Sequence, residues 1–361
     1  MQIDFKNFDI KNILPRTEFE KKVLQFLQDW FSHSETVSVQ TSGSTGIPKV
    51  FEIEKKRMLN SAKMTCDFLG LKEGDTALLC LPVQYISGKM MLVRAIERKL
   101  KIIISVPSSA PEISQNIDFC AMTPLQVQNS LDKIHFIKNL IIGGAAVSEK
   151  LKSQISKELS TINHQPSTNI YETYGMSETL SHIALKQISP IQEEYFTILN
   201  DVEISVDERN CLKIFAPKLN PEILQTNDIV ELMHFMNSVR KPSVYAQGDK
   251  KQFKFLGRFD NVINSGGVKI FAEELENLVK KHIDRDLVFL GKPDETLGEK
   301  LILVIEDAST PLSMKEIKSQ ISNLKFENKF HIPKEILFLE KFPRAENGKI
   351  LRKEILKFLT D

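Results

Sequence analysis

The stretch from Thr41 to Lys49 is TSGSTGIPK, and the strand-like residues 35–40, ETVSVQ, come directly before it. Its first six residues combine hydroxyl side chains with glycines: Thr41, Ser42, Gly43, Ser44, Thr45 and Gly46. The glycines allow backbone N–H groups to converge, the hydroxyls add donors, and Lys49 adds a cation at the rim. The stretch therefore predicts a phosphate-binding loop, with an ordinary Ser/Gly surface loop as the alternative. It differs from the P-loop of NTPases because Lys49 lies beyond the second glycine and no hydroxyl residue follows it.

The rest of the chain alternates short β-rich runs with amphipathic stretches, a pattern typical of α/β architecture. Its 361 residues predict about two domains. The expected helices are Lys55–Leu69 and Ser148–Glu158, with Ser148 as an N-cap. The expected strands are Ala77–Leu81, Lys101–Val106, Leu140–Ile142, Leu212–Phe215 and Leu287–Leu290.

Composition excludes several classes of protein. The 48 Lys and Arg residues and 47 Asp and Glu residues leave a net charge of +1, so the chain offers no general field for nucleic acid or a membrane surface. The N-terminus mixes charged and aromatic residues, unlike a signal peptide, and the apolar runs are only strand-length. We therefore expect a soluble, cytoplasmic protein. Its four cysteines lack zinc-ligand spacing and are expected to be reduced and buried: Cys66, Cys80, Cys120 and Cys211.

A domain boundary is predicted near Asp260. Residues 257–267, GRFDNVINSGG, concentrate turn-forming residues between two structured regions. After them we expect a helix in FAEELENLVKKH at 271–282, a strand, a helix near Met314–Leu324 and a strand at Ile336–Leu339. The sequence thus predicts a large α/β domain at 1–259 and a small α+β domain at 260–361.

Five motifs, in this order, resemble those of the adenylate-forming superfamily of acyl-CoA synthetases, amino-acid-adenylating domains and luciferases. They are TSGSTGIPK, YGMSE at 174–178, QTNDIVEL at 225–232, GRFDNVINSGGVKIFAEELE at 257–276 and PRAENGKILRKE at 343–354. Asn227 stands where the family has a glycine before its Asp. Family members carry the phosphate loop much further along the chain, so the resemblance implies a large domain trimmed at its N-terminus, followed by a mobile small domain. It also implies ATP, Mg²⁺ and CoA as cofactor and co-substrates, and a small carboxylic acid as substrate.

The resemblance assigns a nucleotide site. It implies that Tyr174 stacks on adenine, Ser177 contacts the α-phosphate, and Glu178 holds Mg²⁺ through a hard carboxylate oxygen. It further implies that Asp228 and Arg258 bind the ribose. The ordinary alternatives are core packing for Tyr174, a helix-start charge for Glu178, a cap or turn for Asp228 and a surface ion pair for Arg258.

The resemblance also assigns the residues whose position changes between adenylation and the transfer to CoA. Lys349 would bridge the acid and the α-phosphate during adenylation, and Asp260 would be the hinge about which the small domain turns. Gly266 and Gly267 would then line a tunnel for the pantetheine arm of CoA. Gly144, with its neighbour Gly143, would let the backbone lie against adenine and the acyl group. A surface lysine and plain turns are the alternatives.

The acid is expected to bind near residues 81–96, LPVQYISGKMMLVRAI. On a helix Ser87 and Arg94 share one face. The o-succinylbenzoate–CoA ligases of menaquinone biosynthesis show a similar Ser-Gly and following Arg, which implies that Arg94 binds the second carboxylate of this diacid. Tyr85 departs from the family pattern, which often has His there. The alternative for Arg94 is a surface ion pair with Glu97.

Ser181 and His182, just beyond YGMSE, are further candidates for the acyl site, with a packing role as the alternative for His182. Three other functions stay open on the sequence: a CoA ligase for another aryl or fatty acid, an enzyme that loads a carrier-protein thiol, and a relative that binds ATP without turnover. The oligomeric state does not follow from the sequence.

Overall fold

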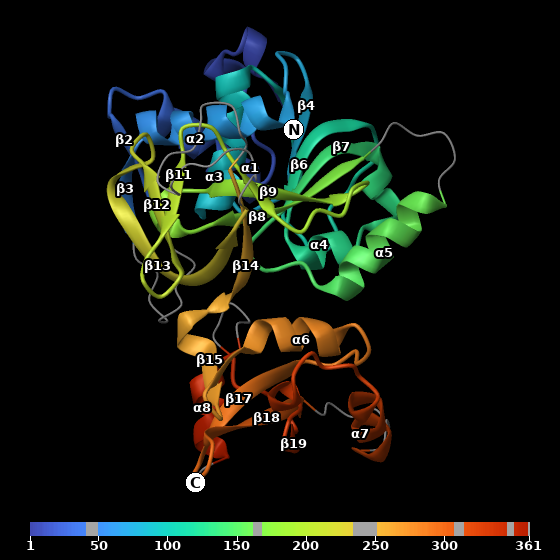
Figure 1. Cartoon of the computed structure of the whole chain (residues 1–361). Helices are drawn as coiled ribbons and strands as arrows, with labels where there is room; N and C mark the ends of the chain where they lie inside the picture. Colours follow the sequence, from blue (N-terminus) through green and yellow to red (C-terminus); the bar gives the residue numbers. More distant parts are fainter. Residues whose placement is uncertain (41–49, 162–167, 234–250, 307–313, 345–349, 360–361) are drawn as a thin grey trace.

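The computed structural model describes residues 1–40, 50–161, 168–233, 251–306, 314–344 and 350–359, and it has the mixed α/β fold that the sequence predicts (Figure 1). A twelve-stranded sheet forms the upper body, and a second, five-stranded sheet lies below it. A separate hairpin joins β2 (Thr36–Gln40) and β3 (Val50–Glu54), the two strands on either side of residues 41–49.

Among the described residues, the large sheet has the order β1 (Gln2–Asp4), β5 (Lys101–Ile104), β4 (Thr76–Leu79), β6 (Ile117–Met122), β7 (Ile137–Ile142), β8 (Asn169–Gly175), β9 (His182–Ser189), β10 (Phe196–Ile198), β14 (Gln252–Arg258), β13 (Asn220–Leu232), β12 (Cys211–Ala216) and β11 (Glu203–Val206). The strands from β5 to β8 run parallel, and those from β8 to β11 pair antiparallel. The parallel strands are nearly continuous apolar runs because both of their faces are buried.

The upper body also contains the helices α1 (Glu18–Trp30), α2 (Lys55–Leu69), α3 (Ile86–Arg98), α4 (Pro124–Gln128) and α5 (Glu149–Ser160). Of these, α3 packs on β4 and β5 of the large sheet and α5 on β9, whereas α2 packs on α3 and α1 on β2. The prediction of α2 is confirmed at both ends, and Gly70 ends it in the left-handed conformation. Ser148 caps α5 as predicted, since its hydroxyl accepts a hydrogen bond from the Leu151 N–H at 3.1 Å. The predicted strands are all present, with bounds that differ by at most four residues.

The lower body contains β15 (Val262–Ser265), β16 (Val268–Phe271), β17 (Leu287–Asp294), β18 (Gly298–Glu306) and β19 (Glu335–Leu339). The helices α6 (Ala272–Lys280), α7 (Met314–Ser322) and α8 (Arg352–Phe358) accompany them. Its two apolar clusters are formed only by residues from Ile263 onward. The predicted helices and the strand near residue 336 are confirmed here.

The turn-rich segment 257–267 also contains a strand that the sequence analysis did not name. Its second half is one arm of the β15–β16 hairpin, in which Ser265 pairs with Val268. Gly266 and Gly267 have φ of 57° and 80°, which is the geometry of a two-residue hairpin turn. The alternation of Val262 to Ser265 and the Gly-Gly pair are the signal for this hairpin.

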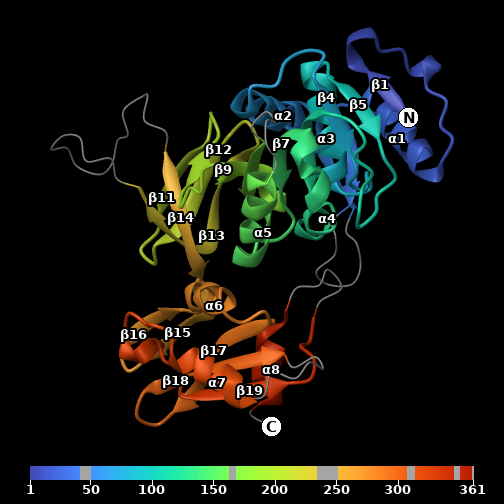
Figure 2. The same ribbon diagram turned by 90° about the vertical axis from the view of Figure 1, so that its right-hand side faces the viewer.

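The chain passes from the upper to the lower body through β14 and the short 3-10 helix η5 (Phe259–Asn261). In both views α6 is the part of the lower body nearest the upper one (Figures 1 and 2). An ion pair of 2.5 Å between Lys150 of α5 and Asp284 also joins the two bodies.

Two expectations from the composition can be compared with the described residues. The four cysteines are free and buried, as predicted. None of the helices in the described ranges is long and apolar enough to cross a membrane.

Candidate functional site

Tyr174 and Asp228 meet although their strands are not neighbours. In the sheet order β8 and β13 are four positions apart, about 19 Å in a flat sheet. The Tyr174 hydroxyl nevertheless donates to Asp228 Oδ2 at 2.5 Å, so this part of the sheet curls. Burial and the neighbouring Asp228 carboxylate both raise the pKa of Tyr174, which keeps the phenol protonated and donating.

Asp228 and Arg258 lie opposite each other in the β13–β14 ladder. Arg258 Nη1 lies 3.5 Å from Asp228 Oδ1, and the Asp228 backbone N–H donates to Thr226 Oγ1 at 3.0 Å. The carboxylate is buried while the guanidinium is exposed. These are the two residues that the sequence assigns to the ribose, and the strand register brings them together.

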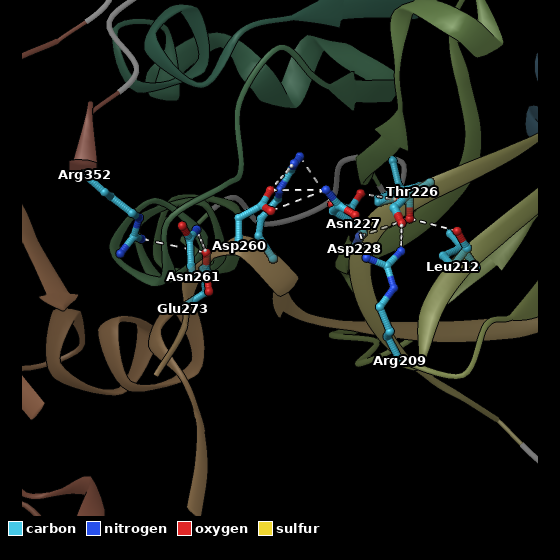
Figure 3. A network of polar contacts seen from close by, with 11 residues as sticks. Arg209, Leu212, Thr226, Asn227, Asp228, Asp260, Asn261, Glu273 and Arg352 are labelled. Atoms are coloured by element: carbon cyan, nitrogen blue, oxygen red, sulfur yellow. Dashed lines mark hydrogen bonds and ion pairs between the residues drawn. The ribbon is translucent and has the colours of Figure 1, made fainter. Parts of the chain in front are cut away.

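Asp260 lies in a polar network at the junction of the two bodies (Figure 3). Its carboxylate accepts from Arg258 Nη2 at 3.1 Å and from Asn227 Nδ2 at 3.4 Å. Asn227 Oδ1 in turn accepts from Arg209 Nη1 at 3.2 Å. Sequence reasoning noted Asn227 only as a departure from glycine and missed Arg209, which no motif marks.

Ser177 and Glu178 lie in the 3-10 helix η4 (Ser177–Thr179), which links β8 to β9. Both are exposed, whereas Thr179 beside them is buried and bonds the loop backbone on both sides. Among the described residues, the Glu178 carboxylate takes part in no hydrogen bond or ion pair, and no cluster of three metal-ligating side chains occurs. One free carboxylate with substrate phosphates and water suits Mg²⁺. A Cβ at Gly175 would overlap the Ser181 carbonyl, so this hairpin requires glycine there.

Gly143 and Gly144 follow β7 at the carboxyl end of a parallel strand, where α/β sheets bind ligands. A Cβ at Gly143 would lie 2.7 Å from Thr173 Oγ1, and Gly144 has a φ of 86°. A larger residue at the first position would displace the Thr173 hydroxyl, and one at the second would strain the backbone.

Arg94 is buried, with only 2% of its surface exposed. Its Nη2 donates to Ser181 Oγ at 2.8 Å, its guanidinium lies 6.0 Å from the Phe119 ring centroid, and its Nε has no partner among the described residues. Burial lowers its pKa to about 10. The alternative for Arg94, a surface ion pair with Glu97, is wrong because α3 places the Arg94 side chain in the interior. Glu97 instead pairs with Arg98 at 3.1 Å.

His182 lies directly behind this contact. Its Nδ1 is 3.4 Å from Ser181 Oγ, and its Nε2 is 3.0 Å from Thr65 Oγ1 on α2. Burial, and then the charge of Arg94, lower the pKa of His182 well below 6.5, so the ring is neutral. The structure thus brings together three of the four predicted acyl-site residues. It adds Thr65, for which the sequence carries no motif.

Ser87, the fourth, is exposed in the first turn of α3. A Cβ at Gly88 would overlap the Pro82 carbonyl, so the Ser-Gly pair lets the start of this helix lie against the preceding loop. Tyr85 is the N-cap of α3 and forms an isolated bridge with Gln40, the last described residue before the predicted phosphate loop.

Gly266 and Gly267 form the β15–β16 turn. A Cβ at Gly266 would lie 2.5 Å from Phe330 Cε1, whereas a Cβ at Gly267 would meet nothing within 4 Å. The first glycine is therefore packed against the Phe330 ring, and the second leaves open space beside the backbone.

Several predicted residues lie outside the described ranges: Thr41, Ser42, Gly43, Ser44, Thr45, Gly46, Lys49 and Lys349. The segments on both sides of residues 345–349 are anchored. Arg344 pairs with Asp286 at 2.8 Å and bridges Ile350. Arg352 contacts both oxygens of the buried Glu276 carboxylate at 2.6 Å.

The chain belongs to the AMP-binding enzyme family, whose model matches residues 3–208. It is thus an adenylate-forming enzyme, the class of protein that the fold and the motifs indicate.

Among characterised relatives, the chain is 26% identical to the 2-succinylbenzoate–CoA ligase of Listeria monocytogenes, over 95% of this chain and 73% of that protein. It is 32% identical to an AMP-forming acyl-CoA synthetase/AMP-acid ligase II-like protein from Dyadobacter fermentans, with a TM-score of 0.62 over 98% and 97% of the two chains. The o-succinylbenzoate–CoA synthetase of Bacillus subtilis in complex with ATP and magnesium has a TM-score of 0.67 at 19% identity, over 89% and 69%.

Proposed function

We propose that this chain is an AMP-forming acid–CoA ligase that converts 2-succinylbenzoate, ATP and CoA into 2-succinylbenzoyl-CoA, AMP and diphosphate, a step of menaquinone biosynthesis. Arg94 is the observation that supports it. A buried guanidinium without a carboxylate among the described residues requires an anionic partner, and a diacid supplies one. The similarity to 2-succinylbenzoate–CoA ligases supports the same substrate.

The chemistry of adenylation explains the distribution of charge. A carboxylate must attack the α-phosphorus of ATP, so two anions meet, and the protein must neutralise charge and align the reactants. Arg94 holds the distal carboxylate of the acid, which fixes the direction of the reacting one. Asp228 and Arg258 hold the ribose and Tyr174 packs on adenine. Glu178 would hold Mg²⁺, which neutralises phosphate charge when bound.

The phosphate loop at 41–49 and Lys349 complete the adenylation site in this proposal. Lys349 neutralises charge between the acid and the α-phosphate. Diphosphate then leaves, and the acid is held as a mixed anhydride with AMP.

In the second half-reaction the CoA thiol attacks the acyl carbon, the C–O bond to AMP breaks, and AMP leaves with the bonding electrons. We assign Asp260 as the hinge between the domains 1–259 and 260–361, and Gly266 and Gly267 to the pantetheine path. The open space beside Gly267 and the sharing of Arg258 between Asp228 and Asp260 support this assignment. Because ATP and CoA are cytoplasmic metabolites, we place the enzyme in the cytoplasm.

The experiment is ATP- and CoA-dependent release of diphosphate with 2-succinylbenzoate, run beside benzoate, a medium-chain fatty acid and a control without acid. Strong preference for 2-succinylbenzoate is the expected result. Release with only another acid would contradict the substrate but keep the adenylation chemistry. Formation of an acyl-adenylate without transfer to CoA would instead indicate a carrier-protein thiol as acceptor.

A further inference from the structure

A chain of polar groups, buried except for the half-buried Ser181, runs from Arg94 and joins three elements. Arg94 of α3 contacts Ser181 Oγ at 2.8 Å, and Ser181 Oγ is 3.4 Å from His182 Nδ1 at the start of β9. His182 Nε2 is 3.0 Å from Thr65 Oγ1, and Thr65 donates to the Ser61 carbonyl at 3.2 Å within α2. Arg94, His182, Thr65 and Ser61 are all buried.

The two ends of this chain fix the direction of three of its four hydrogen bonds. A backbone carbonyl only accepts, so the single Thr65 hydroxyl proton points to the Ser61 carbonyl. Thr65 Oγ1 can then only accept from His182, which places the ring proton on Nε2. At the other end a guanidinium only donates, so Ser181 Oγ accepts from Arg94.

The neutral state of His182 completes the argument. A neutral imidazole carries one ring proton, and because that proton is on Nε2, Nδ1 is free to accept the Ser181 hydroxyl proton. Arg94, Ser181, His182 and Thr65 therefore each donate to the next group, and the chain ends on the Ser61 carbonyl. The Ser181 and Thr65 hydroxyl protons and the imidazole proton are each used once, whereas the Ser61 hydroxyl has no partner among the described residues.

We propose that Thr65 is a positioning residue for recognition of the acid: it fixes His182 as the Nε2–H tautomer and, through Ser181, holds one arm of the Arg94 guanidinium. This inference rests on the proposed function, because it assigns to Arg94 the distal carboxylate. With Nη2 tied to Ser181, the unpartnered Nε stays available for the substrate. A guanidinium held in one orientation loses less side-chain entropy when the acid binds.

The kinetic test compares Thr65→Val, which keeps the shape but removes the acceptor, with Thr65→Ser, which keeps the hydroxyl. In Thr65→Val the buried Nε2–H has no acceptor, so the tautomer with the proton on Nδ1 gains population. Ser181 then receives donors from both His182 and Arg94. We expect KM for 2-succinylbenzoate to rise about tenfold, with kcat and the KM for benzoate changed less than about twofold. Thr65→Ser restores the KM.

Thr197→Val is the matched control. Thr197 is also buried and accepts one side-chain hydrogen bond, from Gln252 Nε2 at 2.8 Å, but it lies outside this chain of groups. It should leave the selectivity between the two acids unchanged. An equal rise of KM for both acids in Thr65→Val, or no rise for either, would overturn the proposal.

A second measurement needs no substrate. Two-bond ¹H–¹⁵N correlation spectra distinguish the two neutral imidazole tautomers, and the His182 signals are assigned by their loss in His182→Gln. We expect the Nε2–H pattern in the wild type and its decrease in Thr65→Val. The Nδ1–H pattern in the wild type would overturn the proposal. Because this readout is independent of turnover, failure of the 2-succinylbenzoate assay with an intact Nε2–H signal would refute the substrate and not the tautomer.

Discussion

Replacement of Arg94 by methionine separates recognition of the acid from stability of the fold. Burial lowers the pKa of Arg94 from 12.5 to about 10, which corresponds to about 3 kcal/mol opposing the charged form in the folded protein. A substrate carboxylate paired with this guanidinium offsets that energy. We therefore expect Arg94→Met to lower kcat/KM for 2-succinylbenzoate by about 150-fold. Benzoate, which has no second carboxylate, should change less than about threefold.

The cost of burying the Arg94 charge also predicts how Arg94→Met affects thermal unfolding. Removal of a buried charge that has no carboxylate partner should leave the midpoint of thermal unfolding unchanged or raise it, because an apolar side chain of similar volume suits the site. Diphosphate release with both acids and a calorimetric melting curve measure the two effects. Arg98→Met, on the same helix but in a surface ion pair with Asp67, is the control that should alter neither acid. Equal losses with both acids, or a clearly less stable Arg94→Met, would refute the reasoning.

Three further predictions concern other groups. Lys349→Ala should abolish formation of the acyl-adenylate yet spare thioester formation from a supplied adenylate; equal loss of both steps would contradict domain alternation. Glu178→Gln should lower the rate of diphosphate release by about 100-fold and raise the Mg²⁺ concentration needed for half-maximal rate, and an unchanged Mg²⁺ titration would exclude it as the ligand. Burial lowers the pKa of His182 below 6.5, so only the unfolded chain takes up this proton below that pH. The free energy of unfolding should therefore fall by up to about 1.4 kcal/mol per pH unit below pH 6.5. In His182→Gln, urea titrations at pH 7 and 5.5 should show a smaller fall in the free energy of unfolding than in the wild type.

The motif residues that we assign to the nucleotide come together in space because their geometry depends on the backbone. Asp228 and Arg258 are opposite each other in a strand ladder, and glycine is favoured at Gly175 by close approach of the backbone and at Gly144 by positive φ. Such constraints act at fixed positions in the sequence, and a motif therefore records them.

The polar groups behind the acid could not be predicted in the same way. Thr65 and His182 are 117 residues apart, and their contact depends on the packing of α2 against the β8–β9 hairpin. Arg94 could equally have paired with Glu97, three residues away; the choice is made by which face of α3 is buried. Likewise, Arg209 reaches Asn227 only because β11 to β14 form one sheet.

The junction near Asp260 indicates where this chain can be exchanged with parts of a relative. The Asp260 side chain contacts Asn227 and Arg258 of the upper body, whereas Asn261 donates to Glu273 of α6 at 2.5 Å (Figure 3). A chimera joined between residues 260 and 261 therefore interrupts neither set of contacts. A junction one residue earlier separates Asp260 from its partners, and one residue later removes Asn261 from α6. The peptide bond between Asp260 and Asn261 is thus the position at which the upper body of this chain can be joined to the small domain of a relative.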